Sequence, residues 1–185
     1  MKNSLIWFTA DTHFGSSRTL TLSRRPFSTV ADMDSTLVEN WNSVVKSSDV
    51  VYHLGDFGDP NFIFSLNGSK IYLIPGNYDT LDVREELKKD DRVTILPSYS
   101  TFTACGIDIH MVHDPIKRVD PNIFYLFGHI HRLQMVKHNS LNVGVDCHFF
   151  KPINLSMVDF YRDAINFHFN ESVFDDFNCV RRKNE

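Results

Sequence analysis

Five short polar clusters divide the first 131 residues of the chain, and at least four of them directly follow an apolar run. A short apolar run that stops at glycine, aspartate, asparagine or histidine is typical of a buried strand followed by a loop. The ends of such strands are where ligand sites form in open α/β sheets. The chain is therefore predicted to fold around a sheet that delivers polar side chains to one edge. The clusters are Asp11-Thr12-His13, Gly55-Asp56, Gly76-Asn77-Tyr78-Asp79, His113-Asp114 and Gly128-His129-Ile130-His131.

Apolar periodicity divides the chain into an alternating first half and a largely β second half. Strands are expected at 5–9, 49–54, 70–74, 93–96, 99–103, 107–112, 123–127, 133–137 and 141–145. Helices are expected at 30–45, 61–66 and 81–89 and after Ser156, and Cys105-Gly106 supplies a turn. The predicted fold class is α+β or α/β. Two mixed sheets form a β-sandwich that helices flank in a four-layer arrangement, within a single domain over residues 1–185.

Composition excludes several classes of protein. With 185 residues, 42% of them hydrophobic and 23% charged, the chain suits a soluble globular domain. No apolar run approaches the roughly 20 residues that span a membrane, so no membrane association is expected. A net charge of -4 argues against an extended nucleic-acid surface. Three widely spaced cysteines do not indicate a disulfide framework, so we expect a protein of the reducing cytoplasm. A phage protein in the cytoplasm of its host would also fit.

The polar clusters have the composition of a metal-ligand set. Asp11 and His13 are two residues apart, so in extended chain they face the same side. His129 and His131 repeat this spacing with two imidazoles. Each cluster also has an ordinary reading, such as an asparagine turn at Asn77. Five of them in order at strand ends favour a metal site over separate structural roles.

The ordered set resembles that of the calcineurin-like metallophosphoesterases. The family pattern is Asp-x-His, Gly-Asp, Gly-Asn-His-Asp/Glu, His and Gly-His-x-His, and the resemblance covers the chain from about Leu5 to Pro152. Arg25-Pro26-Phe27, Asn40-Trp41-Asn42 and residues 142–146 resemble a small bacterial and phage branch of the family. The family fold is a β-sandwich flanked by helices, which agrees with the fold predicted from periodicity.

The resemblance implies a binuclear, metal-dependent phosphoesterase that hydrolyses phosphodiesters by attack of a hydroxide bridging two divalent ions. The first ion would be held by Asp11, His13 and His131, the second by Asn77, His113 and His129, and both by Asp56. Mixed oxygen and nitrogen ligands suit Mn²⁺, which we prefer, and also Fe, Zn²⁺, Co²⁺ or Ni²⁺. The short chain leaves no room for a substantial cap, so we expect a small phosphodiester or nucleotide as substrate.

The chain departs from the family pattern at Tyr78, where the family has histidine as the usual general acid. Tyr78 either donates a proton or hydrogen bond, or only shapes the pocket. With Asp56 and Asn77, Tyr78 and Asp79 complete the expected catalytic set. Arg18 and Arg25 follow the first metal motif and are expected to bind substrate phosphate, with solvated loop residues as the alternative.

Three other histidines are candidates for the general acid, although a structural or peripheral role is the preferred interpretation of each; they are His53, His110 and His148. Two other functions stay open. A catalytically weak binding or scaffold module would be expected to lose several of the seven candidate ligands, and none is missing. A phosphomonoesterase or protein phosphatase is the second alternative, and a protein phosphatase usually needs the histidine that Tyr78 replaces.

Overall fold

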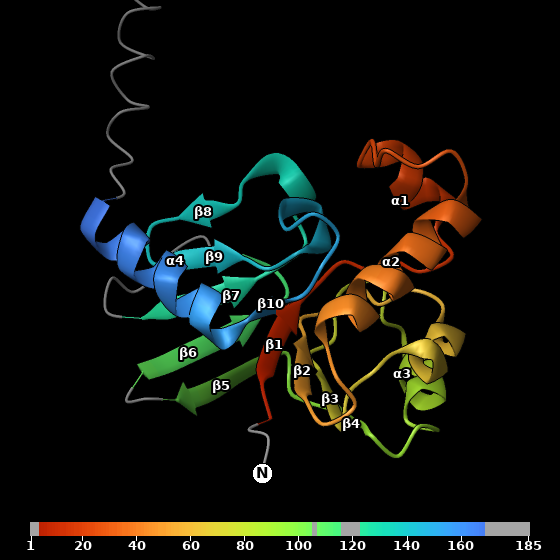
Figure 1. Ribbon diagram of the computed structural model, residues 1–185, viewed down its shortest axis with the longest axis horizontal. Coiled ribbons are helices and arrows are strands. Elements are labelled where there is room, and N and C mark those ends of the chain that lie inside the picture. The colour runs from red at the N-terminus through yellow and green to blue at the C-terminus, as the bar shows by residue number, and fades with distance from the viewer. Residues whose placement is uncertain (1–3, 105–106, 116–122, 169–185) are drawn as a thin grey trace, which may run out of the picture.

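The structure is a computed structural model that describes residues 4–104, 107–115 and 123–168 (Figure 1). The apolar runs of the first half form one five-stranded sheet, to which the chain returns for its last strand. In spatial order the strands are β10 (Ile153–Asn154), β1 (Ile6–Thr9), β2 (Val50–His53), β3 (Lys70–Leu73) and β4 (Val93–Ile95). β1 to β4 are parallel, whereas β10 is antiparallel to β1, so the sheet is mixed.

The second half supplies the other five-stranded sheet. Its strands in spatial order are β5 (Tyr99–Ala104), β6 (Ile107–Val112), β7 (Phe124–Phe127), β9 (Ser140–Asn142) and β8 (Val136–Lys137). β6, β7 and β9 are parallel, and an antiparallel strand closes each edge. This sheet is mixed as well.

Helices flank both sheets (Figure 1). They are α1 (Ser17–Leu22), α2 (Val30–Val44), α3 (Leu81–Leu87) and α4 (Leu155–His168), with 3-10 helices η1 (Pro60–Ser65), η2 (His131–Leu133) and η3 (Val145–Cys147). α2 and α3 lie beside the first sheet, and α4 contacts β9, β10 and β1. The predicted fold class is therefore confirmed. Among the described helices, none is long and apolar enough to cross a membrane.

Neighbouring side chains of β1 belong to two different cores, because successive side chains of a strand point to opposite faces of the sheet. Trp7 packs with Leu37 of α2 on the outer face. Phe8 packs with Met111 and Leu126, between the two sheets. Each such buried side chain contributes roughly 1.5–3 kcal/mol. Burial on both faces explains why β1 appears in the sequence as a continuous apolar run.

Local capping explains where the helices begin. The Thr29 side chain accepts a hydrogen bond from the Asp32 N–H at 3.1 Å, so α2 starts at Val30, as predicted. The Ser16 hydroxyl accepts one from the Thr19 N–H at 3.1 Å and begins α1, a helix that apolar periodicity did not predict. Six residues are too few for such a pattern to appear.

Two predicted strands are shorter than expected. The run at 133–137 begins within η2 and only Val136–Lys137 is a strand, because Leu133 is exposed and pairs with no neighbour strand. The run at 141–145 leaves the sheet after Asn142 and turns into η3. β10 was missed because two residues carry no periodicity. The turn predicted at Cys105-Gly106 lies outside the described residues.

Candidate metal centre

The parallel register of β1, β2 and β3 brings three of the polar clusters to one edge of the first sheet. Trp7 lies beside Val51, and Val51 beside Ile71, so the three strands end level with one another. The chain holds the loops together: the Asp11 N–H donates to the Gly55 carbonyl at 2.9 Å, and the His13 N–H donates to the Asp56 carbonyl at 3.0 Å. The strand ends thus converge as the sequence predicts.

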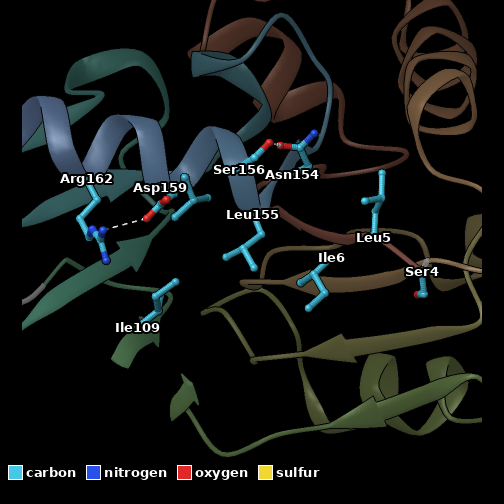
Figure 2. A pocket seen from close by; sticks show the side chains of 10 residues that line it. Ser4, Leu5, Ile6, Ile109, Asn154, Leu155, Ser156, Asp159 and Arg162 are labelled. Carbon is cyan, nitrogen blue, oxygen red and sulfur yellow. Dashed lines mark hydrogen bonds and ion pairs between the residues drawn. The ribbon is translucent and has the colours of Figure 1, made fainter. Parts of the chain in front are cut away.

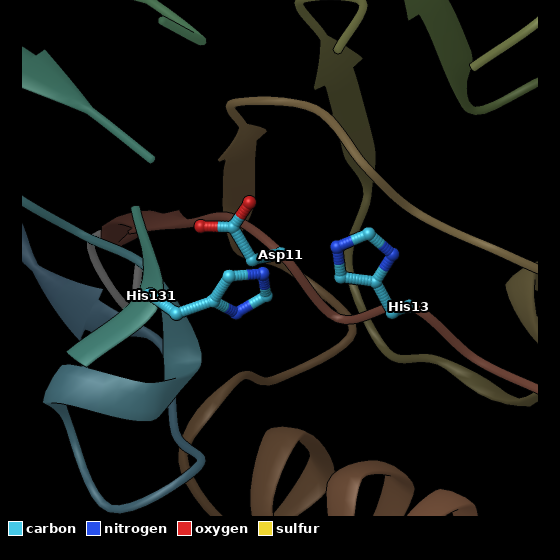
Figure 3. A group of neighbouring side chains, drawn as sticks. All are labelled: Asp11, His13 and His131. Carbon is cyan, nitrogen blue, oxygen red and sulfur yellow. The ribbon is translucent and has the colours of Figure 1, made fainter. Parts of the chain in front are cut away.

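One group of possible ligands consists of Asp11, His13 and His131, whose side chains converge in Figure 3. One ligand atom from each lies within 4.8 Å of the others. The rings of His13 and His131 stack with their centroids 5.3 Å apart. Asp11 and His13 lie in the loop after β1, and His131 begins η2, which follows β7, so the group joins the two sheets.

A second group consists of Asp56, His113 and His129, again with ligand atoms within 4.8 Å of one another. The Asn77 Oδ1 atom lies 3.0 Å from both His113 Nε2 and His129 Nδ1, so Asn77 completes this group. All seven residues that the sequence selected are therefore brought together. Their binding of metal stays a prediction.

Asp56 lies between the two groups. Its Oδ2 atom is 3.4 Å from His13 Nε2 in the first group and 3.2 Å from His113 Nε2 in the second. Its other oxygen, Oδ1, accepts a hydrogen bond from the Tyr78 N–H at 2.9 Å, which fixes the carboxylate. A carboxylate in this position can contact ions in both groups.

The side chains fit metal ions in the chemistry of their donor atoms. His13 Nε2 is buried and has no hydrogen-bond partner in the part of the chain that the structure describes. Burial lowers the pKa of His13 to about 4, so its ring is neutral at pH 7 and has a lone pair available to a ligand. A divalent ion would satisfy this otherwise unpaired nitrogen.

His113 is oriented by the backbone and presents its other nitrogen to the site. Its Nδ1–H donates to the Leu54 carbonyl at 2.7 Å. Burial opposes its charged form, but the hydrogen bond with Asp56 and the nearby Asp11 charge outweigh burial and raise the pKa of His113 to about 9. The two carboxylates therefore hold a proton on His113 where a metal ion could supply the positive charge.

Strained backbone accompanies these side chains. Five of the seven candidate ligands have positive φ angles, which L-residues seldom adopt; they are Asp11 (59°), His13 (48°), Asp56 (57°), His129 (70°) and His131 (49°). Conformations of this kind cost on the order of 1–3 kcal/mol each and cluster at functional sites. Strain concentrated on the ligand set indicates that the surrounding structure is built to hold these side chains.

Glycines allow the loops to approach. A Cβ atom on Gly76 would lie 2.3 Å from Asp56 Oδ1, and one on Gly55 would lie 2.4 Å from the Gly76 nitrogen. Contacts this short do not occur between non-bonded atoms, so either substitution would push Asp56 away from its position between the groups.

Asp146 is a functional residue that the sequence reasoning did not single out. Its side chain, in η3, has no exposed surface and accepts a hydrogen bond from His131 Nδ1 at 2.7 Å, which leaves His131 Nε2 free to face the site. Carboxylates that orient ligand histidines in this way tune the affinity of metal sites. A signal was present, because residues 142–146 belong to the resemblance, but nothing local linked Asp146 to His131.

Arg25 does not lie where we expected it. We predicted a contact with substrate phosphate, but the side chain is buried and pairs with Asp146 at 2.8 and 3.0 Å. It also donates to the backbone carbonyls of Asp11 at 2.5 Å and Thr12 at 2.9 Å. Because its donors are directed into the protein, Arg25 braces the first group from behind.

Asp79 is likewise a positioning residue. It is buried, and its carboxylate accepts hydrogen bonds from the backbone N–H groups of Asp56 (2.7 Å), Phe57 (2.9 Å) and Gly76 (2.8 Å). Burial raises its pKa, against these hydrogen bonds. Asp79 therefore ties the loop after β3 to the loop after β2, and its expected part in catalysis stays a prediction.

Tyr78 lies at the mouth of the site. Its side chain is 48% exposed, and its ring centroid is 5.5 Å from that of His13, edge to face. The Arg18 guanidinium carbon lies 5.9 Å from the Tyr78 ring centroid, at the distance of a cation–π contact. Tyr78 and Arg18 thus stand together beside the first group.

A groove of about 590 Å³ opens directly over the candidate metal centre. Its lining residues are His13, Ser16, Arg18, Thr19, Leu22, Ser23, Arg24, Tyr78, His129, Ile130, His131, Arg132 and Leu133. None of the three other histidines belongs to this lining. His53 is fully buried, His110 contacts Tyr99, and His148 donates to the Asn142 carbonyl.

A second cavity of about 350 Å³ lies near the start of β1 and α4, at the other end of the first sheet (Figure 2). Its walls are largely apolar side chains, such as Leu5, Ile109 and Leu155. Arg162 at its rim pairs with Asp159 at 2.8 Å. It lacks the convergent ligand atoms of the groove.

Comparison with known proteins gives the geometry a context. A family model described as the calcineurin-like phosphoesterase superfamily domain matches residues 5–152. The chain is 28% identical to an uncharacterized protein of Methanocaldococcus jannaschii over 169 residues, covering 83% of this chain and 88% of that protein. It also resembles the crystal structure of a protein of unknown function from Aquifex aeolicus, with a TM-score of 0.70, 24% identity, and coverage of 86% and 100%. The structural likeness indicates a shared fold.

Proposed function

We propose that this chain, which belongs to the calcineurin-like phosphoesterase superfamily, is a phosphodiesterase that works with two divalent metal ions. It would add water across a P–O bond of a phosphodiester and release a phosphomonoester and an alcohol. The observation that carries the proposal is the pair of ligand groups that share Asp56 below an open groove.

Each residue has a distinct part in this proposal. Asp11, His13 and His131 would hold one ion; Asn77, His113 and His129 would hold the other; and Asp56 would contact both. When bound, the ions supply Lewis acids for the phosphoryl oxygens and lower the pKa of water. Mn²⁺ is our preferred metal, because two carboxylates and an amide oxygen join the imidazoles.

The surroundings of the site favour a diester. The groove extends beyond the ligand groups, so a substrate can have substituents on both sides of the phosphorus atom. Tyr78 replaces the histidine of the family pattern and stands over the first group beside Arg18. A tyrosine hydroxyl is a weaker proton donor than a protonated histidine, so esters with acidic leaving groups should be the better substrates.

Metal reconstitution tests the proposal. The metal-stripped protein is assayed on a nitrophenyl phosphodiester and a nitrophenyl monoester after addition of Mn²⁺, Ni²⁺ or Zn²⁺ singly, and bound metal is counted by elemental analysis. We expect metal-restored turnover that favours the diester and is lost in Asp56→Asn. The matched control is Asp91→Asn, an exposed residue in the turn between α3 and β4.

The outcomes separate the alternatives. Turnover that no metal restores, with Asp56→Asn binding as much metal as the wild type, would overturn the proposal and favour a scaffold module. A stronger restored activity on the monoester would instead identify a phosphomonoesterase.

A further inference from the structure

The groove over the candidate metal centre concentrates positive charge. Three of its lining residues are arginines, Arg18, Arg24 and Arg132, and its lining includes no aspartate or glutamate. All three arginines are exposed, and none forms an ion pair with another residue that the structure describes. In a chain with a net charge of -4, such a group of unpaired cations is a local exception. Cations in a concave surface raise the local concentration of anionic ligands.

One diester phosphate does not need all of these charges. Two divalent ions would outweigh the carboxylates of Asp11 and Asp56 and the attacking hydroxide by one positive charge, and a phosphodiester has one negative charge. The ions alone could therefore neutralise the phosphate that is cleaved. Arg24 and Arg132 stand in the same groove as a further cationic site, and guanidinium groups bind phosphate through paired hydrogen bonds.

Apolar side chains lie among the arginines. Leu22 is four residues after Arg18 on α1, so the two share a face of that helix. Leu133 follows Arg132 in η2. Leu22 is 67% exposed and Leu133 is 85% exposed, and both line the groove. Sites for small organic ligands combine apolar walls with a few polar groups. The walls therefore suit a ligand with an organic part between its charged groups.

We propose that the substrate is a phosphodiester that carries at least one further phosphate on its organic part, and that Arg24 and Arg132 bind that second phosphate. A nucleotide ester phosphorylated on its other sugar oxygen has this chemistry, and so does the end of a short oligonucleotide. This inference rests on the proposed function and specifies its substrate class.

Two matched esters test the inference. Thymidine 5′-(4-nitrophenyl phosphate) and its 3′-phosphorylated form share the same scissile bond and leaving group. We expect kcat/KM to be about ten- to a hundredfold higher for the 3′-phosphorylated ester, as charge-assisted hydrogen bonds to phosphate would give. Arg24→Ala and Arg132→Ala should each lower that ratio severalfold. The control Arg162→Ala, at the second cavity, should leave the ratio unchanged.

Binding provides a readout that does not depend on turnover. Calorimetry of thymidine 3′,5′-bisphosphate and thymidine 5′-phosphate, without added metal, should give a lower Kd for the bisphosphate in the wild type and a smaller difference in Arg24→Ala. Equal kcat/KM for the two esters together with equal Kd values would overturn the inference. Failure to cleave either ester with any metal would overturn the proposed function instead, and the calorimetry would still test the arginines.

A third ligand distinguishes the two sources of the second phosphate. A 5′-phosphorylated thymidine tetranucleotide is titrated beside the bisphosphate at several salt concentrations. Tighter binding of the tetranucleotide, with a steeper salt dependence, supports a nucleic-acid end. Tighter binding of the bisphosphate supports a small nucleotide. If neither the tetranucleotide nor the bisphosphate binds at millimolar concentration, the inference is wrong.

Discussion

The two candidate metal groups differ in what surrounds them. In the first group, Asp11 and His13 are buried, and His131 is backed by Asp146, which has no exposed side-chain surface and pairs with Arg25. In the second group, the His129 side chain is 41% exposed, and its charged neighbour Asp114 is 68% exposed. Asp56 and His113 of the second group are also buried, so the groups differ at one ligand each: the first is braced from within the protein at His131, whereas the second opens toward solvent at His129.

This difference predicts different metal affinities. A buried carboxylate holds its partner in a fixed position and is little screened, whereas an exposed one moves and is screened by solvent and salt. The ion of the first group should therefore bind tightly and exchange slowly, and the ion of the second group should exchange readily.

Removal of the internal brace should have the largest effect. Arg25→Ala leaves Asp146 as a buried carboxylate without its cation, which we expect to lower the free energy of unfolding by about 3–5 kcal/mol. The measurement is urea unfolding of the metal-stripped protein. Arg84→Ala, on the surface of α3, is the control and should cost less than about 1 kcal/mol. An Arg25→Ala protein as stable as this control would refute the brace.

Restoration of the family residue beside the first group should change the choice of substrate. Tyr78→His would place a stronger general acid over His13, and we expect about a hundredfold gain in kcat/KM on alkyl phosphodiesters, with little change on nitrophenyl esters. The ratio of the two activities is the measurement, and Tyr78→Phe serves as the control for the ring. If the ratio stays constant in Tyr78→His, residue 78 only shapes the pocket.

Loss of each supporting carboxylate should separate the two groups directly. Asp146→Asn removes the charge behind His131 and should weaken one Mn²⁺ site about 10–100-fold. Asp114→Asn removes the exposed charge beside His129 and should weaken the other site by less than about tenfold. Titration of the metal-stripped protein with Mn²⁺, in which free Mn²⁺ is followed by electron paramagnetic resonance, gives the Kd of each site. Equal losses in the two variants would contradict the contrast between the groups.

Acid should destabilise the metal-free protein, because two of its histidines, His53 and His13, are buried in their neutral form. Burial lowers the pKa of His53 to about 3 and that of His13 to about 4, below the ordinary value of 6.5. At these two histidines the unfolded chain binds more protons below pH 6.5, which lowers stability by up to about 1.4 kcal/mol per pH unit for each histidine. Burial raises the pKa of Asp11 to about 6, so the folded chain takes up a proton there below pH 6 and offsets about one of the two slopes. Urea unfolding at pH 7, 6 and 5 measures this slope. His53→Gln should reduce it, and an unchanged slope would show that His53 is not responsible.

Much of this organisation is local and could be predicted. The strands β1, β2 and β3 appear as apolar runs because they are covered on both faces, and a polar residue follows each one where it leaves the sheet. Parallel pairing in register then brings Asp11, Asp56 and Asn77 together. The ligand candidates were identifiable because the order of the clusters along the chain resembles the family pattern, which assigns a ligand to each cluster.

Other features depend on distance in space and could not be predicted. Arg24 and Arg25 are neighbours in the chain, yet Arg24 lines the groove and Arg25 is buried under the first group. Backbone direction at one residue, a positive φ of 49° at Arg24, separates the two, and no sequence pattern specifies it. The pairing of Arg25 with Asp146 spans 121 residues and arises only when η3 packs against the loop after β1.

The amino-acid sequence was enough to predict the fold class, which follows from short-range hydrophobic patterning, and the candidate ligands, whose order along the chain resembles the family pattern. Only the tertiary structure decided how those ligands divide into a braced group and an open group. It also decided which arginine supports Asp146 and which arginines line the groove. The reason is physical: burial and charge pairing depend on which distant segments meet, and two adjacent arginines with the same chemistry acquire opposite roles once one of them is enclosed.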